Sequence, residues 1–110
     1  MTNCVRLVVF VPTTHADAVR QAMGEAGAGK IGNYTFCSFS VTGTGRFLPN
    51  AQANPAVGKA GALNQVEEER IEVVCAEDKI APVVTAIQHV HPYEEPVIDI
   101  YPVLDIEQYL

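Results

Sequence analysis

The densest group of titratable side chains in the sequence lies in the segment HPYEEP, residues 91–96. His91 could bind a borderline metal or move a proton, because an imidazole titrates near a pKa of ~6.5. A divalent metal held by His91 and Glu95, with a neighbouring subunit completing the site, is one use of this segment. Acid–base chemistry by His91 and Glu94 is another.

The same segment also has the composition of a turn. Pro92 disfavours a helical conformation at the residue before it, so a helix is expected to end at His91. A cationic His at that end would be favoured by the helix dipole. Tyr93 would then pack over the start of a final strand. We therefore expect this segment to be a structural turn in the first place. It would contact a ligand only where a neighbouring subunit completes the site.

A second candidate is the stretch GTGRFLPNAQANPAVGKAGALNQ, residues 43–65, which is rich in glycine and has no apolar period. It predicts a long loop, and loops beyond ~12–15 residues in compact domains are usually functional or disordered. Arg46 and Lys59 supply cations, while Gly43 and Gly45 can expose backbone amides, so the loop could bind a small anionic ligand. A structural loop that clasps subunits together is the alternative.

Asn33 lies in a third glycine-rich stretch, GAGKIGNY, residues 27–34. It could contact the same ligand, together with Tyr93 and Glu94. The simpler interpretation is a tight turn in which glycines take positive φ angles and Asn33 stabilises the turn.

Apolar periodicity predicts four strands, at 4–11, about 34–42, about 66–75 and 97 to about 103. The first is apolar at nearly every position, which is typical of a central strand buried on both faces. Alternation in the second and third strands predicts which side chains face the core. These are Cys37, Phe39 and Val41 in the second strand, and Ile71, Val73 and Cys75 in the third.

Two helices are predicted between these strands. The first begins with Thr13 or Thr14 as its cap and ends at Gly27, and the second begins with Asp78 as its cap. Each carries one apolar stripe. The stripes are Ala16, Val19, Met23 and Ala26 in the first helix, and Ile80, Val83, Val84, Ile87 and His91 in the second.

The order βαββαβ predicts one domain over 1–110 with a ferredoxin-like α+β fold. Four antiparallel strands would carry two helices on one face of the sheet. The opposite face would stay open, lined by Tyr34, Phe36, Val74 and Tyr101. Such a face usually needs a partner, most simply another copy of the chain.

Composition excludes some partners. The net charge is −6, with no block of Lys or Arg, which disfavours nucleic-acid binding. No apolar run approaches the ~18–20 residues that span a bilayer, and the first twelve residues predict a strand rather than a signal peptide. Three widely spaced cysteines are typical of buried thiols in a reducing compartment, so we expect a cytoplasmic protein.

Three stretches together resemble the insert domain of the Nif-three-like proteins: AGAGKIGNYTFCSFSVTGTGRFLP (26–49), NPAVGKAGALNQVEEERIEVV (54–74) and HPYEEPVIDIYPV (91–103). The resemblance implies a stand-alone version of that insert, with a fold like the PII and CutA proteins. It also implies a trimer with ligand clefts between subunits. These 110 residues do not include the flanking domains that carry the family's dinuclear metal site, so the resemblance does not imply its hydrolase or cyclohydrolase activity.

His91 matches the HPY motif of the CutA proteins. The places of that family's further copper-binding Cys and Glu read FVPTT and VIDI here. The function we expect is therefore a non-catalytic, oligomeric module that binds a small ligand or a partner between subunits, as a trimer or else a dimer. A metal-binding protein using His91 at an interface and a small hydrolase using His91 and Glu94 are the alternatives.

Overall fold

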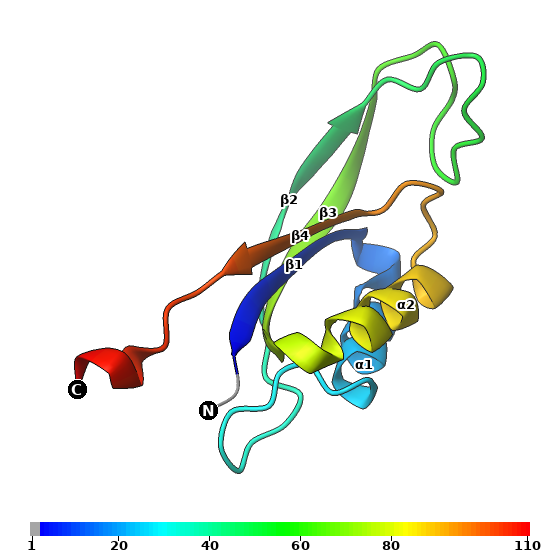
Figure 1. Ribbon diagram of the computed structural model, residues 1–110. Helices are drawn as coiled ribbons and strands as arrows, with labels where there is room; N and C mark the ends of the chain where they lie inside the picture. The colour runs from blue at the N-terminus through cyan, green and yellow to red at the C-terminus, as the bar shows by residue number, and fades with distance from the viewer. Residues whose placement is uncertain (1–2) are drawn as a thin grey trace.

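The computed structural model describes residues 3–110, and Met1 and Thr2 lie outside the described residues. Its main elements run in the predicted order βαββαβ (Figure 1). They are β1 (Cys4–Pro12), α1 (Ala16–Glu25), β2 (Phe39–Phe47), β3 (Asn64–Ala76), α2 (Ile80–Val90) and β4 (Val97–Pro102). Short 3-10 segments are found at Thr13–His15, Glu77–Lys79 and Ile106–Tyr109.

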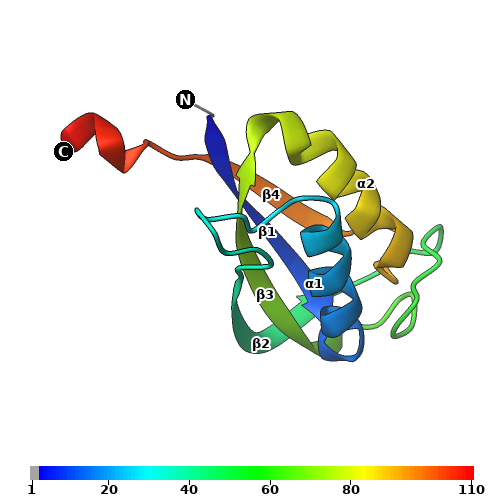
Figure 2. The same cartoon turned by 90° about the horizontal axis from the view of Figure 1, so that it is seen from below.

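The four strands form one antiparallel sheet in the order β2-β3-β1-β4. The central strand β1 pairs with both β3 and β4, so that Val9 lies opposite Ile71 and Ile98. Both helices cover the same face of the sheet (Figures 1 and 2). The predicted ferredoxin-like α+β fold is confirmed.

The core lies between this face and the helices, and its members are at most 3% exposed. The predicted stripes supply most of it, because side chains alternate along strands and repeat every three or four residues along helices. The buried side chains are Leu7, Val9, Val11, Ile71, Val73 and Cys75 from the sheet, and Ala16, Val19, Met23, Val83 and Ile87 from the helices. Val8, on the opposite face of β1, is also fully buried.

The end of α1 confirms the predicted glycine stop. Gly27 has a φ of +109°. Its N–H donates to Gly24 O at 3.1 Å, and the N–H of Ala28 donates to Met23 O at 3.0 Å. This pair of bonds is the Schellman arrangement, which satisfies carbonyls that the helix leaves open.

The predicted helix caps are wrong. A 3-10 segment precedes each helix, so the residues at the N-cap positions are His15 and Lys79, and neither makes a side-chain capping bond. Thr13, Thr14 and Asp78 lie within those 3-10 segments. The chain turns from strand to helix through the tighter helix rather than through a capped end.

The second strand begins and ends about five residues later than predicted, and its apolar side chains do not face the core as predicted. Strand β2 begins at Phe39, which is 62% exposed, and Val41 is 46% exposed. Ser40 lies on the helix side instead, where Arg20 of α1 donates to its hydroxyl at 3.0 Å and also pairs with Glu69. The helix side of this edge strand is therefore polar.

The predicted loop 43–65 is too long at both ends. Gly43, Gly45 and Arg46 belong to β2 and pair with β3 opposite Glu68, Val66 and Gln65. The connection between the two strands is therefore 48–63. Cross-strand pairing holds a glycine-rich stretch in a strand that its composition alone does not favour.

The open face of the sheet differs in part from the prediction. Val74 and Tyr101 flank Arg6 in the register, on the face away from the helices. Phe36 instead packs its ring against Gly24 of α1, and Tyr34 pairs with Ile31 in the turn before β2. Exposed Phe39, Val41 and Val97 join Tyr101 on the open face.

The cysteines also differ in part from the prediction. Cys75 is buried in the core, whereas Cys4 and Cys37 are partly exposed, and Cys37 lies in the connection before β2. Within residues 3–110, no helix is both long enough and apolar enough to cross a membrane.

Candidate ligand pocket

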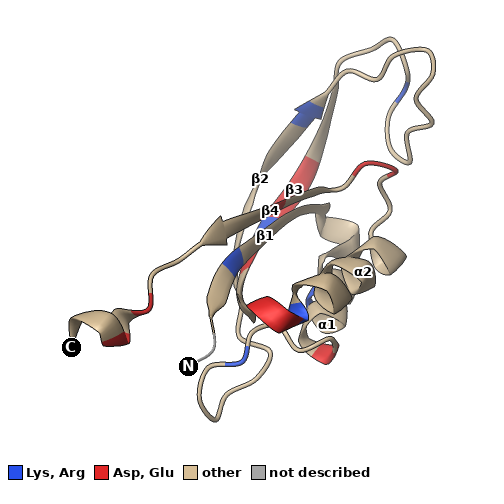
Figure 3. Cartoon of the chain, viewed as in Figure 1, with Lys and Arg blue, Asp and Glu red and all other residues tan. Residues whose placement is uncertain are grey.

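A pocket of about 300 Å³ lies where β2 enters the 48–63 loop and the turn 91–96 enters β4. Acidic residues gather at this end of the molecule, on β3 and on the turn before β4 (Figure 3). Most of the pocket surface is apolar. Its main apolar side chains are Phe47, Leu48, Pro49, Pro55, Val57 and Val97. This volume is at the small end of the range typical of ligand sites.

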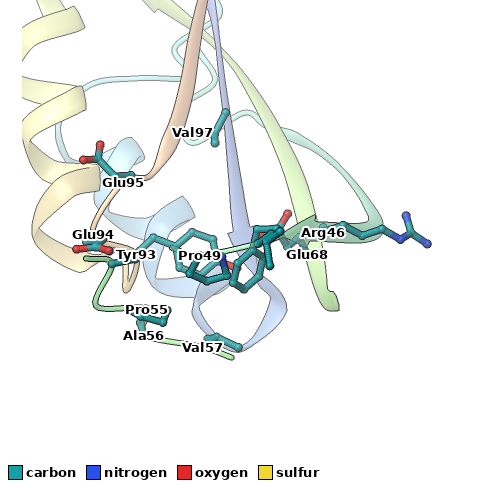
Figure 4. Close-up of a pocket in the computed structure, with 14 residues that line it drawn as sticks. Arg46, Pro49, Pro55, Ala56, Val57, Glu68, Tyr93, Glu94, Glu95 and Val97 are labelled. Carbon is teal, nitrogen blue, oxygen red and sulfur yellow. The ribbon is translucent and has the colours of Figure 1, made fainter. Parts of the chain in front are cut away.

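Tyr93 and Glu68 form the polar centre of the pocket (Figure 4). The Tyr93 hydroxyl donates to Glu68 Oε2 at 2.7 Å. The Tyr93 ring lies 6.4 Å from the ring of Phe47, tilted by 52°. Burial, together with the hydrogen bond to Glu68 and its charge, raises the pKa of Tyr93, so its phenol stays protonated and donates.

Gly45 makes room for the Glu68 carboxylate. A Cβ at this position would overlap Glu68 Oε1. Neither Glu68 nor Phe47 was singled out from the sequence. They reach Tyr93 only through the register of β2 on β3, which alternation by itself does not determine.

His91 lies beneath the pocket, with 7% of its surface exposed. Its Nδ1 lies 3.1 Å from the Tyr93 N–H and its Nε2 lies 2.7 Å from Phe10 O. An N–H can only donate and a carbonyl can only accept, so Nδ1 carries no proton and Nε2 carries one. The hydrogen bonds therefore select one neutral tautomer.

The predicted helix end at His91 is confirmed, whereas the cationic form that the helix dipole would favour is not the form that its hydrogen bonds select. The extended backbone of His91 follows α2 directly, and its N–H still bonds to Ile87 O at 2.8 Å. Burial lowers the pKa of His91, although the hydrogen bond to Phe10 and the charge of Glu68 oppose the shift. The neutral imidazole gains its two bonds in place of an interaction with the helix dipole.

Glu94 joins the turn to the loop. Its Oε1 accepts the Asn54 N–H at 2.9 Å, a contact between residues 40 positions apart. The carboxylate of Glu95 is exposed nearby. In Figure 4 both lie on the Tyr93 side of the pocket, whereas the guanidinium of Arg46 extends away from Tyr93.

The structure brings some of the predicted site residues together and separates others. Those that line the pocket are Gly45, Arg46, Tyr93, Glu94 and Glu95. Gly43, Lys59 and Asn33 are not among its lining residues. Asn33 lies in the turn closed by the Ile31–Tyr34 pair, and the backbone of Lys59 bonds to the Asn64 side chain. The two cations of the predicted anion site therefore do not meet here.

Of the two predicted metal ligands, His91 is buried and Glu95 is exposed. Across the described part of the chain, no group of three or more His, Cys, Asp or Glu side chains is arranged to hold a metal ion. For His91 to bind a metal, one of its two ring nitrogens would have to give up its hydrogen bond. Metal binding by His91 and Glu95 stays a prediction.

No protein-family model matches the chain. It is 55% identical over 97 residues to the GTP cyclohydrolase 1 type 2 homolog of Halalkalibacterium halodurans, covering 88% of this chain and 26% of that protein. It is 51% identical over 94 residues to the protein of the same name from Mycobacterium leprae, covering 86% and 24%. The chain thus spans about a quarter of the length of these curated relatives.

Solved structures are similar to this chain as well. A Bacillus cereus protein related to NIF3 superposes with a TM-score of 0.81 at 44% identity, over 94% of this chain and 26% of that one. The divalent cation tolerance protein CutA from Archaeoglobus fulgidus gives 0.69 at 16% identity, over 97% and 91%. The ATP complex of B. subtilis GlnK gives 0.62 at 15%, over 94% and 84%. The last two show likeness of fold alone.

Proposed function

We propose, from the homology of this chain to one segment of the Nif-three-like proteins, that it is a non-catalytic, self-associating module that binds a small ligand. The ligand site would be the pocket between the 48–63 loop and the turn 91–96, extended by a neighbouring copy of the chain. Trimers are the favoured assembly and dimers the alternative.

The pocket is the observation that carries this proposal. Two segments distant in the sequence close around about 300 Å³ of mostly apolar space. The Asn54–Glu94 bond joins them, and the Tyr93–Glu68 bond fixes a polar group at the centre. A largely apolar cavity with a few placed polar groups is the usual composition of a small-molecule site.

The hydrogen bonds of His91 and Glu94 support a role in binding rather than catalysis. Both ring nitrogens of His91 bond to backbone groups, and one carboxylate oxygen of Glu94 bonds to Asn54. An acid–base pair needs groups that can reach a substrate proton. The cyclohydrolase name belongs to relatives about four times as long, and our proposal does not include that activity.

Self-association is proposed from the open face of the sheet. Phe39, Val41, Val97 and Tyr101 are each at least 42% exposed there, and apolar groups that share a face usually mark an interface. Sedimentation equilibrium should give an oligomer for the natural chain and a shift toward monomer for Val41→Asp. Ile31→Asp, in a turn outside the sheet, is the matched control and should stay oligomeric. A natural chain that is monomeric at ~100 μM would contradict this part of the proposal.

The ligand site can be tested by filling the pocket. Ala56 lines the pocket and Ala60 does not, although both are exposed residues of the same loop. We expect some members of a panel of small organic compounds to raise the melting temperature of the natural chain, since binding to the native state stabilises it. Ala56→Phe should abolish this response and Ala60→Phe should keep it. An equal response of both variants would place the binding elsewhere.

A further inference from the structure

We propose that the pocket binds a small organic ammonium ligand, with its cationic head beside Glu68 and its apolar body against the walls. This inference rests on the proposed function, because it names the class of ligand for the same pocket. It departs from the anionic ligand that Arg46 and Lys59 predict from the sequence.

Most of the charged side chains that line the pocket are carboxylates. Glu68, Glu94 and Glu95 are three carboxylates, against one lining cation, Arg46, so the charge of the lining is −3 + 1 = −2. Arg46 extends away from the pocket centre in Figure 4. An anion would meet the Glu68 carboxylate at the centre of the pocket and two more carboxylates beyond Tyr93, whereas a ligand with N–H donors and a positive charge would meet its complement.

Glu68 is the carboxylate placed to receive such a head group. Its Oε2 accepts a hydrogen bond from the Tyr93 hydroxyl at 2.7 Å, and that bond uses the only hydrogen of the hydroxyl. The structure gives Oε1 no hydrogen-bond donor among the described residues, and it lies over Gly45, where no side chain intervenes. Glu68 thus keeps acceptor capacity for a ligand in a partly buried place.

The aromatic rings at this point fit an organic cation. Phe47 and Tyr93 lie 6.4 Å apart with tilted rings, and both line the pocket with Glu68. The faces of aromatic rings attract cations, most strongly those with little bound water. An alkylated ammonium group loses less hydration than a metal ion, and its carbon chain can cover Leu48, Pro49 and Val57.

The exposed C-terminal segment of a second copy is a rival occupant. Leu104, Ile106 and Tyr109 are each at least 70% exposed, so this segment has the apolar groups to enter a pocket. It also carries Asp105 and Glu107 between them. These carboxylates would be brought toward Glu94 and Glu95, so charge favours a small cation over this segment.

Three probes with one carbon chain separate charge from apolar contact: hexylammonium, hexanol and hexanoate. We expect NMR titrations of the full chain at pH 7 to show shifts at Phe47, Tyr93 and Val97. Hexylammonium should bind at least ~10-fold more tightly than hexanol, the effect of one charge-assisted hydrogen bond, and hexanoate should cause no shift. Raising the salt concentration should weaken the binding of hexylammonium alone.

Glu68→Gln keeps an acceptor for Tyr93 but removes the charge, so hexylammonium should then bind no better than hexanol. Glu67→Gln makes the same change of charge on the next residue, which points to the other face of β3 and lies outside the pocket lining, and it should leave binding unchanged. The three-probe comparison on the natural chain stands even if Glu68→Gln fails to fold.

The outcomes distinguish this inference from the function on which it rests. Tighter binding of hexanoate, or equal binding of hexanol and hexylammonium, would overturn the ammonium ligand and leave a ligand pocket in place. A failure of all three probes to shift pocket resonances, together with no response to the compound panel, would overturn both proposals.

Discussion

The stability of the fold should depend on pH through His91. Burial lowers the pKa of His91 in the folded chain below its ordinary value of 6.5, which the unfolded chain retains. Between those two pKa values the unfolded state binds more protons than the folded state. The free energy of unfolding should therefore fall as pH falls through 6.5 toward the folded-state pKa, and level off below it.

The hydrogen bonds of His91 give this prediction a second cause. A proton on Nδ1 would face the Tyr93 N–H at 3.1 Å, so two donors would meet where one bond existed. The full linkage of one proton gives a slope of at most ~1.4 kcal/mol per pH unit. His91→Gln and His91→Asn both remove the titration and each can imitate one ring nitrogen.

The two substitutions should differ in the bond that they lose. Gln places an amide N–H near the position of Nε2, so it keeps the bond to Phe10 and loses the one to Tyr93. Asn places an oxygen near Nδ1 and has the reverse effect. Each leaves one backbone group without its partner, and we expect a loss of about 1–2 kcal/mol at pH 7.5 for either variant. His91→Ala loses both bonds and packing volume, with an expected cost of about 3–4 kcal/mol.

Urea unfolding followed by circular dichroism from pH 5.5 to 7.5 measures these changes. The protein concentration must be held constant, because association shifts apparent stability. The gap between natural chain and His91→Gln should narrow as pH falls, since only the natural chain loses stability by titration of this group. His89→Gln alters an exposed histidine and should keep the natural slope. A gap that stays constant over this range would refute the assignment to His91.

Two glycines give further predictions. Gly24→Ala places a Cβ into the ring of Phe36, so it should destabilise the natural chain by about 1 kcal/mol in urea unfolding, yet stabilise a Phe36→Ala background by up to ~1 kcal/mol through helix propensity. The same sign in both backgrounds would contradict the contact. Gly45→Ala should displace the Glu68 carboxylate and weaken hexylammonium binding in the NMR titration, whereas Gly43→Ala has open space around its Cβ and should not. Equal weakening by both would show that the Glu68 position is irrelevant to binding.

The parts of the fold that could be predicted from the sequence rest on local patterns. Strand β1 is apolar at nearly every position, and its burial follows from that run. The α1 stripe of Ala16, Val19 and Met23 is fully buried because helical spacing alone places these residues on one side. The glycine stop at Gly27 likewise needs only neighbours a few residues away.

Strand β2 could not be oriented by the same reasoning. Its alternation separates Phe39 and Val41 from Ser40, but a period of two does not say which set faces the helices. At this edge the helix side is occupied by the Arg20 side chain, which bonds to Ser40 and Glu69. The apolar set therefore lies on the open face, which a sequence rule for monomers assigns to polar residues.

The residues at the centre of the pocket could not be predicted from local sequence patterns either. The sequence singled out Tyr93 and Glu94 because titratable groups cluster around them. Their partners, Glu68 and Asn54, lie 25 and 40 residues away, and they meet only after β2, β3 and the loop are in place. Glu68 is one of several glutamates on β3, and only the register of the strands places it beside the Tyr93 phenol.

The segment HPYEEP divides its titratable groups between the interior and the surface. His91 turns inward and holds the Tyr93 backbone through Nδ1, while the Tyr93 ring turns to Glu68 and Glu94 bonds the loop. The His91 imidazole thus positions the phenol that in turn holds the pocket carboxylate, without lining the pocket itself. A change at His91 should therefore weaken ligand binding indirectly, through the position of Tyr93. Residues that look like one cluster in the sequence have separate roles, because His91 is buried against the Tyr93 ring whereas Glu94 is exposed and bonds to the loop.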